Sequence, residues 1–173
     1  MAEFSASGGV SRFGDTSLLT APKVTLGDGF RLALRFTLNT YRFFGHEIGY
    51  GYAHTAAKVA GTGDSLGMPV HQFFYDFLIY GTPEGARIRP FAAGGAQFSS
   101  FFPPGSSVYY GNQVTKFGYN YGGGLKFIVT GPWGARIDVR QYATGKPDLF
   151  QTAQAPSGWM RQTEVSAGVS FNF

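Results

Sequence analysis

The most constraining feature of this sequence is a two-residue alternation that persists over whole segments. The last segment, Gln162–Phe173, has mainly apolar side chains at the odd positions and polar or small ones at the even positions. A period of two places successive side chains on opposite faces of a β-strand. The segment is therefore predicted to be a strand with one apolar face and one polar face.

The same alternation recurs along the chain and predicts eight strands. They cover Ala2–Phe13, Phe30–Phe43, Glu47–Thr55, Val70–Tyr80, Arg87–Phe98, Thr115–Val129, Arg136–Tyr142 and Gln162–Phe173. Several of these exceed the length of an average globular strand, about 5 to 6 residues. They reach the length of about 9 to 11 residues with which a strand crosses a membrane.

The predicted connections alternate between short and long. Short turns are expected at Phe44–His46, Gly81–Ala86 and Gly131–Gly134, and long loops at Gly14–Asp28, Ala56–Gly67, Ser99–Val114 and Ala143–Trp159. Short turns at one end and long loops at the other are typical of outer-membrane barrels, whose loops are extracellular. An even number of strands then places both termini on the periplasmic side.

Composition and charge exclude several classes of protein. The chain has no Cys, which rules out disulfides, thiol catalysis and cysteine-based zinc sites. It also lacks the run of about 20 apolar residues that a transmembrane helix needs. Its formal net charge of +4 comes from scattered Lys and Arg, so nucleic acid is not an expected partner. The start, Met1–Glu3, shows no signal peptide, and we expect a cytosolic chain or a mature form that restarts with Met.

The remaining composition suits a sheet that faces lipid. Aromatic residues make up 17% of the chain and charged residues 14%, against about 25% charged in a soluble domain. Lipid cannot satisfy backbone polar groups, so a sheet that crosses a membrane must close on itself. We therefore predict one domain, residues 1–173, that forms an all-β, eight-stranded antiparallel up-and-down transmembrane barrel. Interfacial girdles are expected from Tyr41, Phe43, Tyr80, Phe91, Phe127, Phe171 and Phe173. A soluble lipocalin-type barrel is the alternative and would need its apolar residues inside.

Three segments resemble a known family. They are Arg136–Tyr142, the strand start Arg89–Gly95 and the C-terminal Val169–Phe173. Together they resemble the small eight-stranded outer-membrane barrels of the OmpA, OmpX and opacity-protein type. The resemblance implies a bacterial outer-membrane location, contact with outer-membrane lipids and lipopolysaccharide, and an assembly signal at Phe171 and Phe173 that the barrel-assembly machinery recognises. The family's separate periplasmic domain is not expected in this chain.

Charged residues gather on the face predicted to line the lumen. This set is Glu3, Arg31, Arg35, Glu47, Asp76, Arg89, Lys116, Lys126, Arg136, Asp138, Arg140 and Glu164. Side chains fill the interior of an eight-stranded barrel, and buried charges persist only when they are paired. We predict a luminal charge network of Arg35, Glu47, Asp76, Lys126, Arg136, Asp138, Arg140 and Glu164. A filled lumen favours a structural or surface-interaction role, and a narrow or gated pore is the alternative.

Enzymatic and metal sites find little support in the sequence. The luminal carboxylates have no cleft that would admit a substrate. Some outer-membrane barrels of similar size are lipid-modifying enzymes with Ser and His together at the rim; here His54 has Thr55 beside it near the predicted outer rim, but His46 and His71 have no Ser two residues away. A lipid-modifying enzyme is therefore the less favoured alternative. The three His show no metal-ligand spacing. We predict no catalytic residue, no metal and no cofactor.

The third long loop is the candidate for an extracellular partner. It is rich in aromatic residues around two prolines, and the candidate contacts are Phe101, Phe102, Tyr109 and Tyr110. Aromatic side chains at a loop tip can form a binding surface.

Overall fold

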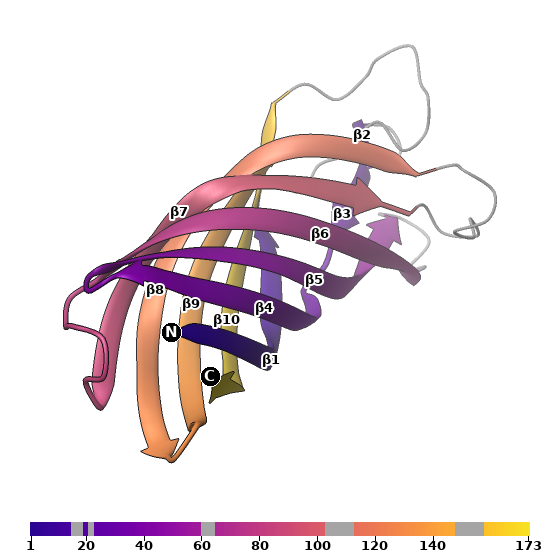
Figure 1. Ribbon diagram of the computed structural model, residues 1–173. Coiled ribbons are helices and arrows are strands. Elements are labelled where there is room, and N and C mark those ends of the chain that lie inside the picture. Colours follow the sequence, from indigo (N-terminus) through magenta and orange to yellow (C-terminus); the bar gives the residue numbers. More distant parts are fainter. Residues whose placement is uncertain (15–18, 21–22, 60–64, 103–112, 148–157) are drawn as a thin grey trace.

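The computed structural model describes residues 1–14, 19–20, 23–59, 65–102, 113–147 and 158–173. Eight long strands wrap into a tilted barrel (Figure 1). They are β1 (Ala2–Gly14), β4 (Gly29–Tyr41), β5 (Phe44–Val59), β6 (Ser65–Tyr80), β7 (Ile88–Phe101), β8 (Val114–Thr130), β9 (Trp133–Gly145) and β10 (Trp159–Asn172). Two short strands, β2 (Leu19–Thr20) and β3 (Lys23–Leu26), follow β1. In the described ranges, no helix is long and apolar enough to span a membrane.

The sheet closes on itself through antiparallel pairs only. Around the ring the order is β1, β4, β5, β6, β7, β8, β9, β10 and back to β1. The predicted eight-stranded antiparallel barrel is confirmed. The two additional strands lie outside the ring: β2 pairs with β3, and β3 pairs with the end of β5 around Val59.

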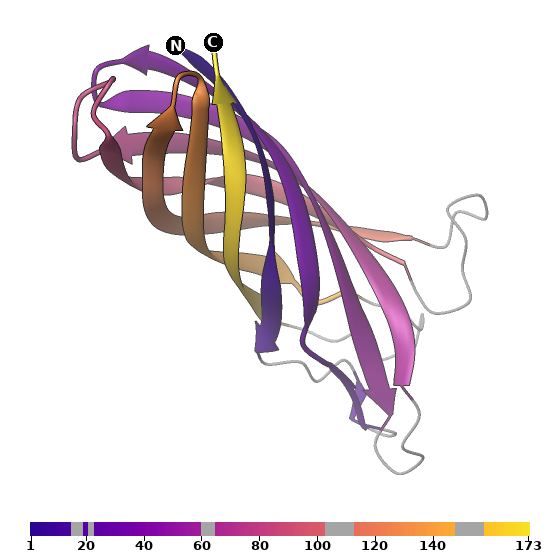
Figure 2. The same ribbon diagram turned by 90° about the horizontal axis from the view of Figure 1, so that it is seen from below.

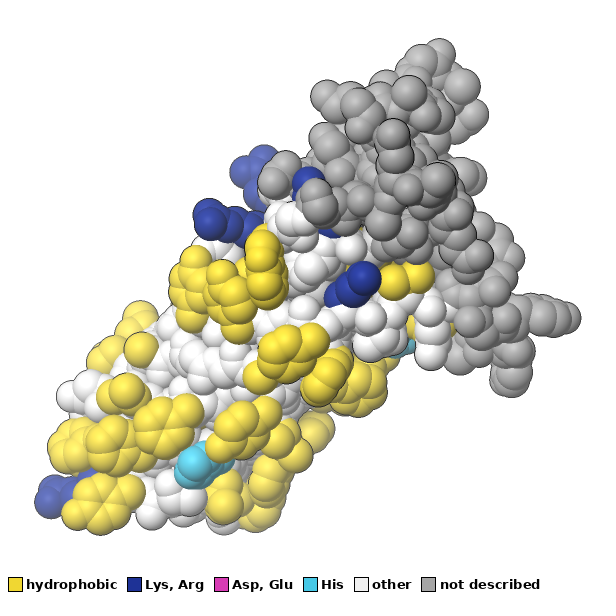
Figure 3. Space-filling view, turned by 90° about the horizontal axis from the view of Figure 1, so that it is seen from above, with side chains coloured by type: hydrophobic (Ala, Val, Ile, Leu, Met, Phe, Trp, Pro, Cys, Tyr) yellow, Lys and Arg dark blue, Asp and Glu magenta, His cyan; other side chains and the backbone are white. Residues whose placement is uncertain are grey.

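The side chains face as the alternation predicted. Leu34 and Val165 are both 47% exposed on the outside, whereas their neighbours Arg35 and Glu164 are buried inside. Figure 3 shows hydrophobic side chains along the length of one outer face. The soluble alternative is therefore wrong, because the large apolar residues cover the outside and the charges fill the inside. This arrangement suits lipid, which favours apolar contact and leaves polar groups to be satisfied within the protein.

The two ends of the barrel differ. Both termini lie at one end, which we call the turn end (Figure 2). There, the backbones of Ala2 and Phe173 exchange two hydrogen bonds of 2.9 Å each. The terminal amine of Met1 lies 3.0 Å from Glu84 in the β6–β7 turn. The opposite end, called the loop end, carries the three longest connections between strands of the ring.

Three predicted connections need correction. The first turn is the dipeptide Arg42–Phe43 and not Phe44–His46, because Phe44 already pairs with Tyr41. Gly45 lies within β5 and faces Asn39 and the Tyr80 ring; an added Cβ would come within 3.3 Å of both. The glycine there makes room for side chains in the barrel and does not form the turn.

The second correction concerns the expected loop Ala56–Gly67. Strands β5 and β6 pair through most of it, as far as Lys58 with Ser65, so only residues 60–64 connect them. A hairpin that extends beyond the bilayer no longer needs large apolar residues on its outer face. The small residues in this segment show no clear hydrophobic alternation, so the sequence pattern does not predict that the strands continue here. Similarly, β9 begins at Trp133, so the last turn is Gly131–Pro132 and not Gly131–Gly134.

Two aromatic residues predicted for the girdles lie inside the barrel. Tyr80 and Phe91 are 3% and 6% exposed and pack with Leu78 and Ala93. The reason is their parity along the strand: Tyr80 shares its face with Leu78, and Phe91 shares its face with Ala93. Facing, rather than nearness to a strand end, decides where an aromatic side chain lies.

Candidate functional site

The barrel interior holds a network of buried charges. The described charges buried in the lumen are Glu3, Arg31, Arg35, Glu47, Asp76, Arg89, Lys126, Arg136, Asp138, Arg140 and Glu164. Every residue of the predicted luminal network is among them. The remaining member of the wider predicted set, Lys116, is only half-buried near the loop end of β8. Because charges deep in a barrel cannot reach bulk water, their arrangement decides whether the interior is stable.

Glu47 is the centre of the network. Its Oε2 lies 3.0 Å from Nη1 of Arg136, and its Oε1 lies 2.6 Å from Nη2 of Arg140. Arg35 approaches the same carboxylate at 3.7 Å, and the Thr37 hydroxyl donates a 2.8 Å hydrogen bond to it. Strands β5 and β9 are four strands apart in either direction around the ring. The contacts from Glu47 to β9 therefore cross the full width of the barrel.

Glu164 on β10 is a second centre, closer to the loop end. Its carboxylate lies 2.8 Å from Nε of Arg31 and 2.8 Å from Nη2 of Arg35, both on β4. The hydroxyls of Tyr142 and Ser166 donate hydrogen bonds of 2.7 and 2.6 Å to it. Both carboxylate oxygens are thus occupied, and Arg35 links this centre to Glu47.

Asp138 and Asp76 complete the arginine cluster on β9. Arg136 donates two hydrogen bonds of 2.8 Å to the two oxygens of Asp138, a bidentate pair. Arg140 bonds to Asp76 on β6 and lies 3.5 Å from Asp138. Because each arginine contacts more than one carboxylate, loss of any one group changes the surroundings of several others.

A smaller group of charged residues lies in the lumen toward the turn end. Lys126 Nζ lies 2.8 Å from Glu3 and donates a 3.2 Å hydrogen bond to the Tyr80 hydroxyl. The Arg89 guanidinium lies 3.6 Å from the centroid of the Tyr80 ring. Among the described residues, no carboxylate pairs with Arg89, so the aromatic ring is its main partner.

An uncharged polar layer lies between the ion pairs and the loop end, and the sequence analysis missed it. Arg31 donates to the Gln72 side chain, whose amide nitrogen bonds to Ser99 and Gln162 at 3.0 Å each. Gln97 donates to Thr144 at 2.8 Å. The alternation does place these residues on the inner face, but a search for charged groups gives no reason to single them out.

Small residues make space for the large luminal side chains. An added Cβ at Gly51 would come within 2.3 Å of the Arg31 guanidinium, and one at Gly49 within 2.2 Å of the Phe74 ring. Both glycines face inward on β5. Without a side chain there, the arginine and the phenylalanine can lie flat against the barrel wall.

The predicted loop contacts divide into two pairs. Phe101 ends β7 on its inward-facing side and is 1% exposed, and Phe102, 6% exposed, packs edge-on against the His71 ring at 5.1 Å, so neither is displayed at a loop tip. Tyr109 and Tyr110 lie outside the described residues. A binding role for this loop remains a prediction that would depend on the two tyrosines.

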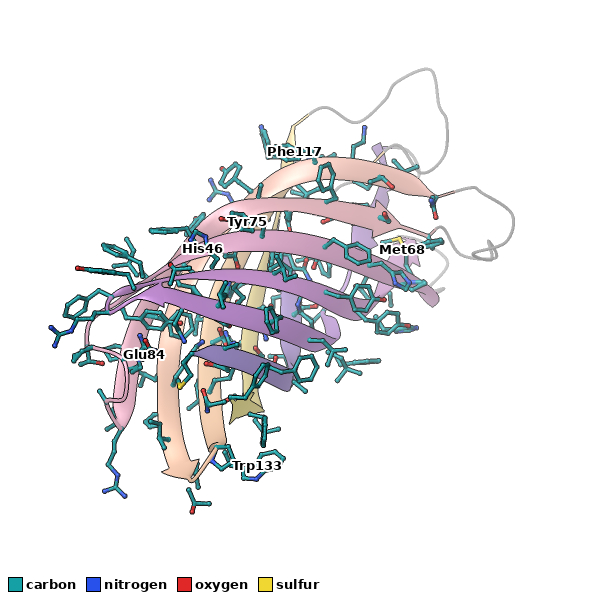
Figure 4. All side chains as sticks on the ribbon, viewed as in Figure 1. His46, Met68, Tyr75, Glu84, Phe117 and Trp133 are labelled. Atoms are coloured by element: carbon teal, nitrogen blue, oxygen red, sulfur yellow. The ribbon has the colours of Figure 1, made fainter. Side chains whose placement is uncertain are left out.

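The predicted assembly residues lie on the outer face at the turn end. Phe171 packs edge-on against Trp133 at 5.2 Å, and Phe173 lies 6.3 Å from the Phe36 ring. Figure 4 shows Trp133 beside the turn that joins β8 and β9. Their recognition by an assembly machinery remains a prediction.

The three histidines lie on the outer face: His46 and His71 are paired with tyrosines, and His54 stacks on the Phe30 ring at 5.7 Å. His46 lies 2.7 Å from the Tyr75 hydroxyl, and both residues are labelled in Figure 4. His71 lies 2.5 Å from the Tyr50 hydroxyl and stands directly opposite Ser100 in the β6–β7 register. Within the described ranges, no group of three or more His, Asp or Glu could hold a metal ion.

Comparison with solved structures supports the same architecture. The barrel matches Neisserial surface protein A with a TM-score of 0.70 and 16% identity, covering 99% of this chain and 97% of that one. It matches OprG from Pseudomonas aeruginosa at 0.63 and 13% (99% and 96% covered) and the outer membrane enzyme PagL at 0.58 and 16% (99% of both chains). At these identities the matches show the fold alone. No match was found among curated protein sequences.

A family model decides the relationship. The model described as "Outer membrane protein beta-barrel domain" matches residues 2–173, nearly the whole chain. With the closed barrel, the apolar outer face and the charged lumen already established, the chain belongs to this family and is an integral β-barrel of the bacterial outer membrane.

Proposed function

We propose that this protein is a closed, non-conducting barrel that serves as a membrane anchor and presents its loop end to the outside for surface interactions. The observation that supports this most directly is the contact of Glu47 with Arg136 and Arg140 across the full width of the lumen. Solute transport would require these pairs to separate. The parts left for function are the loops and the outer face.

Planar-bilayer conductance tests the closed state. We expect the purified protein to conduct little or only intermittently, because each charge in the central network already has a partner. A large, steady conductance would favour the alternative, a narrow pore. The pore is supported by the polar filling of the lumen, because ion pairs can exchange partners and let an ion pass, whereas a lumen packed with apolar side chains could not.

The proposed orientation places the loop end outside and both termini in the periplasm. It is supported by the short turns, such as Gly131–Pro132, which lie at the same end as both termini. An epitope inserted within residues 103–112 should react with antibody on intact cells. The same epitope within residues 82–86 should react only after permeabilisation, and the opposite pattern would reverse the orientation.

The surface role is tested on the loop aromatics. We expect the double change Tyr109→Ala and Tyr110→Ala to lower the adherence of expressing cells to immobilised matrix proteins and to cell monolayers. Tyr41→Ala, an exposed aromatic at the turn end, is the matched control. Equal adherence of all three proteins would remove the loop from the proposal and leave the closed barrel standing.

We also propose that the chain is not an enzyme. Ser100 lies opposite His71 in the β6–β7 register, although the two are far apart in the sequence. A neighbouring Ser and His could act as nucleophile and base, so this pair is the one to test. Ser100 Oγ shares a 2.9 Å hydrogen bond with Thr115, and His71 Nδ1 is engaged by Tyr50. Incubation with lipopolysaccharide should release no acyl chains. Release that is lost in Ser100→Ala would identify a lipid-modifying activity instead.

A further inference from the structure

We propose that the outer face holds one phosphorylated lipid of the outer leaflet, with its phosphate on Arg12 and Arg161 and an acyl chain in a groove across β1, β4 and β5. This site rests on the proposed orientation, in which the loop end faces outside. The two arginines and the groove are separate features of the same face of the barrel. Together they provide what a lipid with an anionic head and an apolar tail requires.

The two arginines are neighbours on adjacent strands. Arg12 pairs with Thr163 and Gly14 with Arg161 in the β1–β10 register, so the arginines are diagonal neighbours. Both are exposed on the outer face. Diagonal neighbours in an antiparallel pair are about 7–8 Å apart, which lets two guanidinium groups converge on one phosphate. Arginine is well suited to this because its planar group donates two parallel hydrogen bonds.

Their depth matches that of lipid headgroups. Next to Arg12 on the outer face of β1 is Val10, which is 59% exposed and belongs to the apolar band. On the other side, Trp159 lies two residues beyond Arg161, is half exposed and packs on Tyr119 at 5.4 Å. Exposed Trp and Tyr gather at the membrane interface. Figure 3 also shows Lys and Arg gathered next to the loop end.

The groove lies deeper in the apolar band, on the same face. It encloses about 400 Å³ between Ala6 on β1, Leu32 and Leu34 on β4, and Tyr50 and Tyr52 on β5. A second hollow of about 330 Å³ shares Leu34 and Tyr50 and continues the groove toward β6.

The distance between the two parts suits a lipid. Gly8, which lies opposite Leu32 beside the groove, is four residues from Arg12, or about 14 Å along the strand at ~3.4 Å per residue. A headgroup at Arg12 could therefore lead an acyl chain into the hollow, where it would bury more apolar surface than on a smooth wall.

Asp28 forms an ion pair with Arg12 and so affects how strongly the site can bind a phosphate. Its carboxylate lies 3.1 Å from Nε of Arg12, and the two side chains are 57% and 78% exposed. Such an exposed pair contributes little to stability, so a phosphate can replace the carboxylate. Asp28 then acts as a competitor for Arg12, and its removal should strengthen lipid binding.

Native mass spectrometry of the detergent-purified protein with diphosphoryl lipid A tests the phosphate contacts. We expect Arg12→Gln with Arg161→Gln to weaken binding at least about tenfold, because the double change removes both charge-assisted contacts with the phosphate. Asp28→Asn should strengthen it, and Arg42→Gln, an exposed arginine at the turn end, should leave it unchanged. Binding that is equal in all variants, or reduced equally by Arg42→Gln, overturns the site.

Two further experiments test whether the acyl chain lies in the groove. Ala6→Phe fills the groove and should weaken lipid A binding, whereas Ala92→Phe, which also faces outward but lies on β7, should not. Displacement of lipid A by an equal concentration of inorganic phosphate, or equal binding by both variants, overturns the acyl-chain contact. None of these changes touches the lumen, so conductance and epitope exposure report separately on the proposed function.

Discussion

Glu47 on β5 and Arg136 on β9 form an ion pair across the diameter of the barrel, with Oε2 and Nη1 3.0 Å apart. Both side chains are fully buried. The pair connects two walls that are four strands apart in either direction around the sheet. It therefore joins opposite walls of the barrel through the lumen.

The stability of the barrel should depend strongly on Glu47. Glu47→Ala removes the carboxylate that Arg35, Arg136 and Arg140 all contact, and breaking a buried pair typically costs about 3–5 kcal/mol. Urea unfolding of the protein in lipid vesicles, followed by tryptophan fluorescence, measures this change in the free energy of unfolding. Glu84→Ala is the control, because Glu84 pairs with the exposed terminal amine and should cost less than about 1 kcal/mol.

Removal of Glu164 should open a path for ions. Glu164→Ala frees Arg31 and Arg35 from their common carboxylate, and we expect lower stability together with greater ion leakage in planar bilayers. Glu84→Ala again serves as the control and should leave leakage as in the parent. If Glu164→Ala changes neither stability nor leakage, the contacts of Glu164 neither stabilise the barrel nor hold back ions.

The lipid-facing register can be tested at Val165. An arginine placed on the lipid face at mid-bilayer costs about 2–4 kcal/mol, so Val165→Arg should lower the free energy of unfolding by that amount. The neighbouring inward position provides the comparison, since Ser166→Asn keeps a polar group in a polar interior. Greater sensitivity at Ser166 than at Val165 would contradict the observed facing.

The C-terminal phenylalanine should matter for assembly more than for the folded state. Phe173 is 65% exposed, and its backbone pairs with Ala2 at the seam of the barrel. We expect deletion of Phe173 to lower the amount inserted in cells, as measured in isolated outer membranes, while refolding in detergent survives. Outer-membrane levels equal to those of the parent would exclude an assembly role.

The sequence alone determined the closed barrel and the facing of its strands. A period of two assigns each side chain to a face, and lipid demands that large apolar groups lie outside and that backbone groups pair within the sheet. Leu34 outside and Arg35 inside follow from these two constraints. The charges of the lumen follow as well, because the inner face is the only polar side of each strand.

Only the tertiary structure decided which groups meet. Glu47 and Arg136 are 89 residues apart, and their contact depends on the tilt of the strands and the stagger of the closed sheet. The same holds for the amide layer around Gln72, for the diagonal placement of Arg12 and Arg161, and for Tyr80, whose partners Arg89 and Lys126 come from other strands. Alternation fixes the face of a residue, whereas its height in the barrel and its partners across the lumen come from closure.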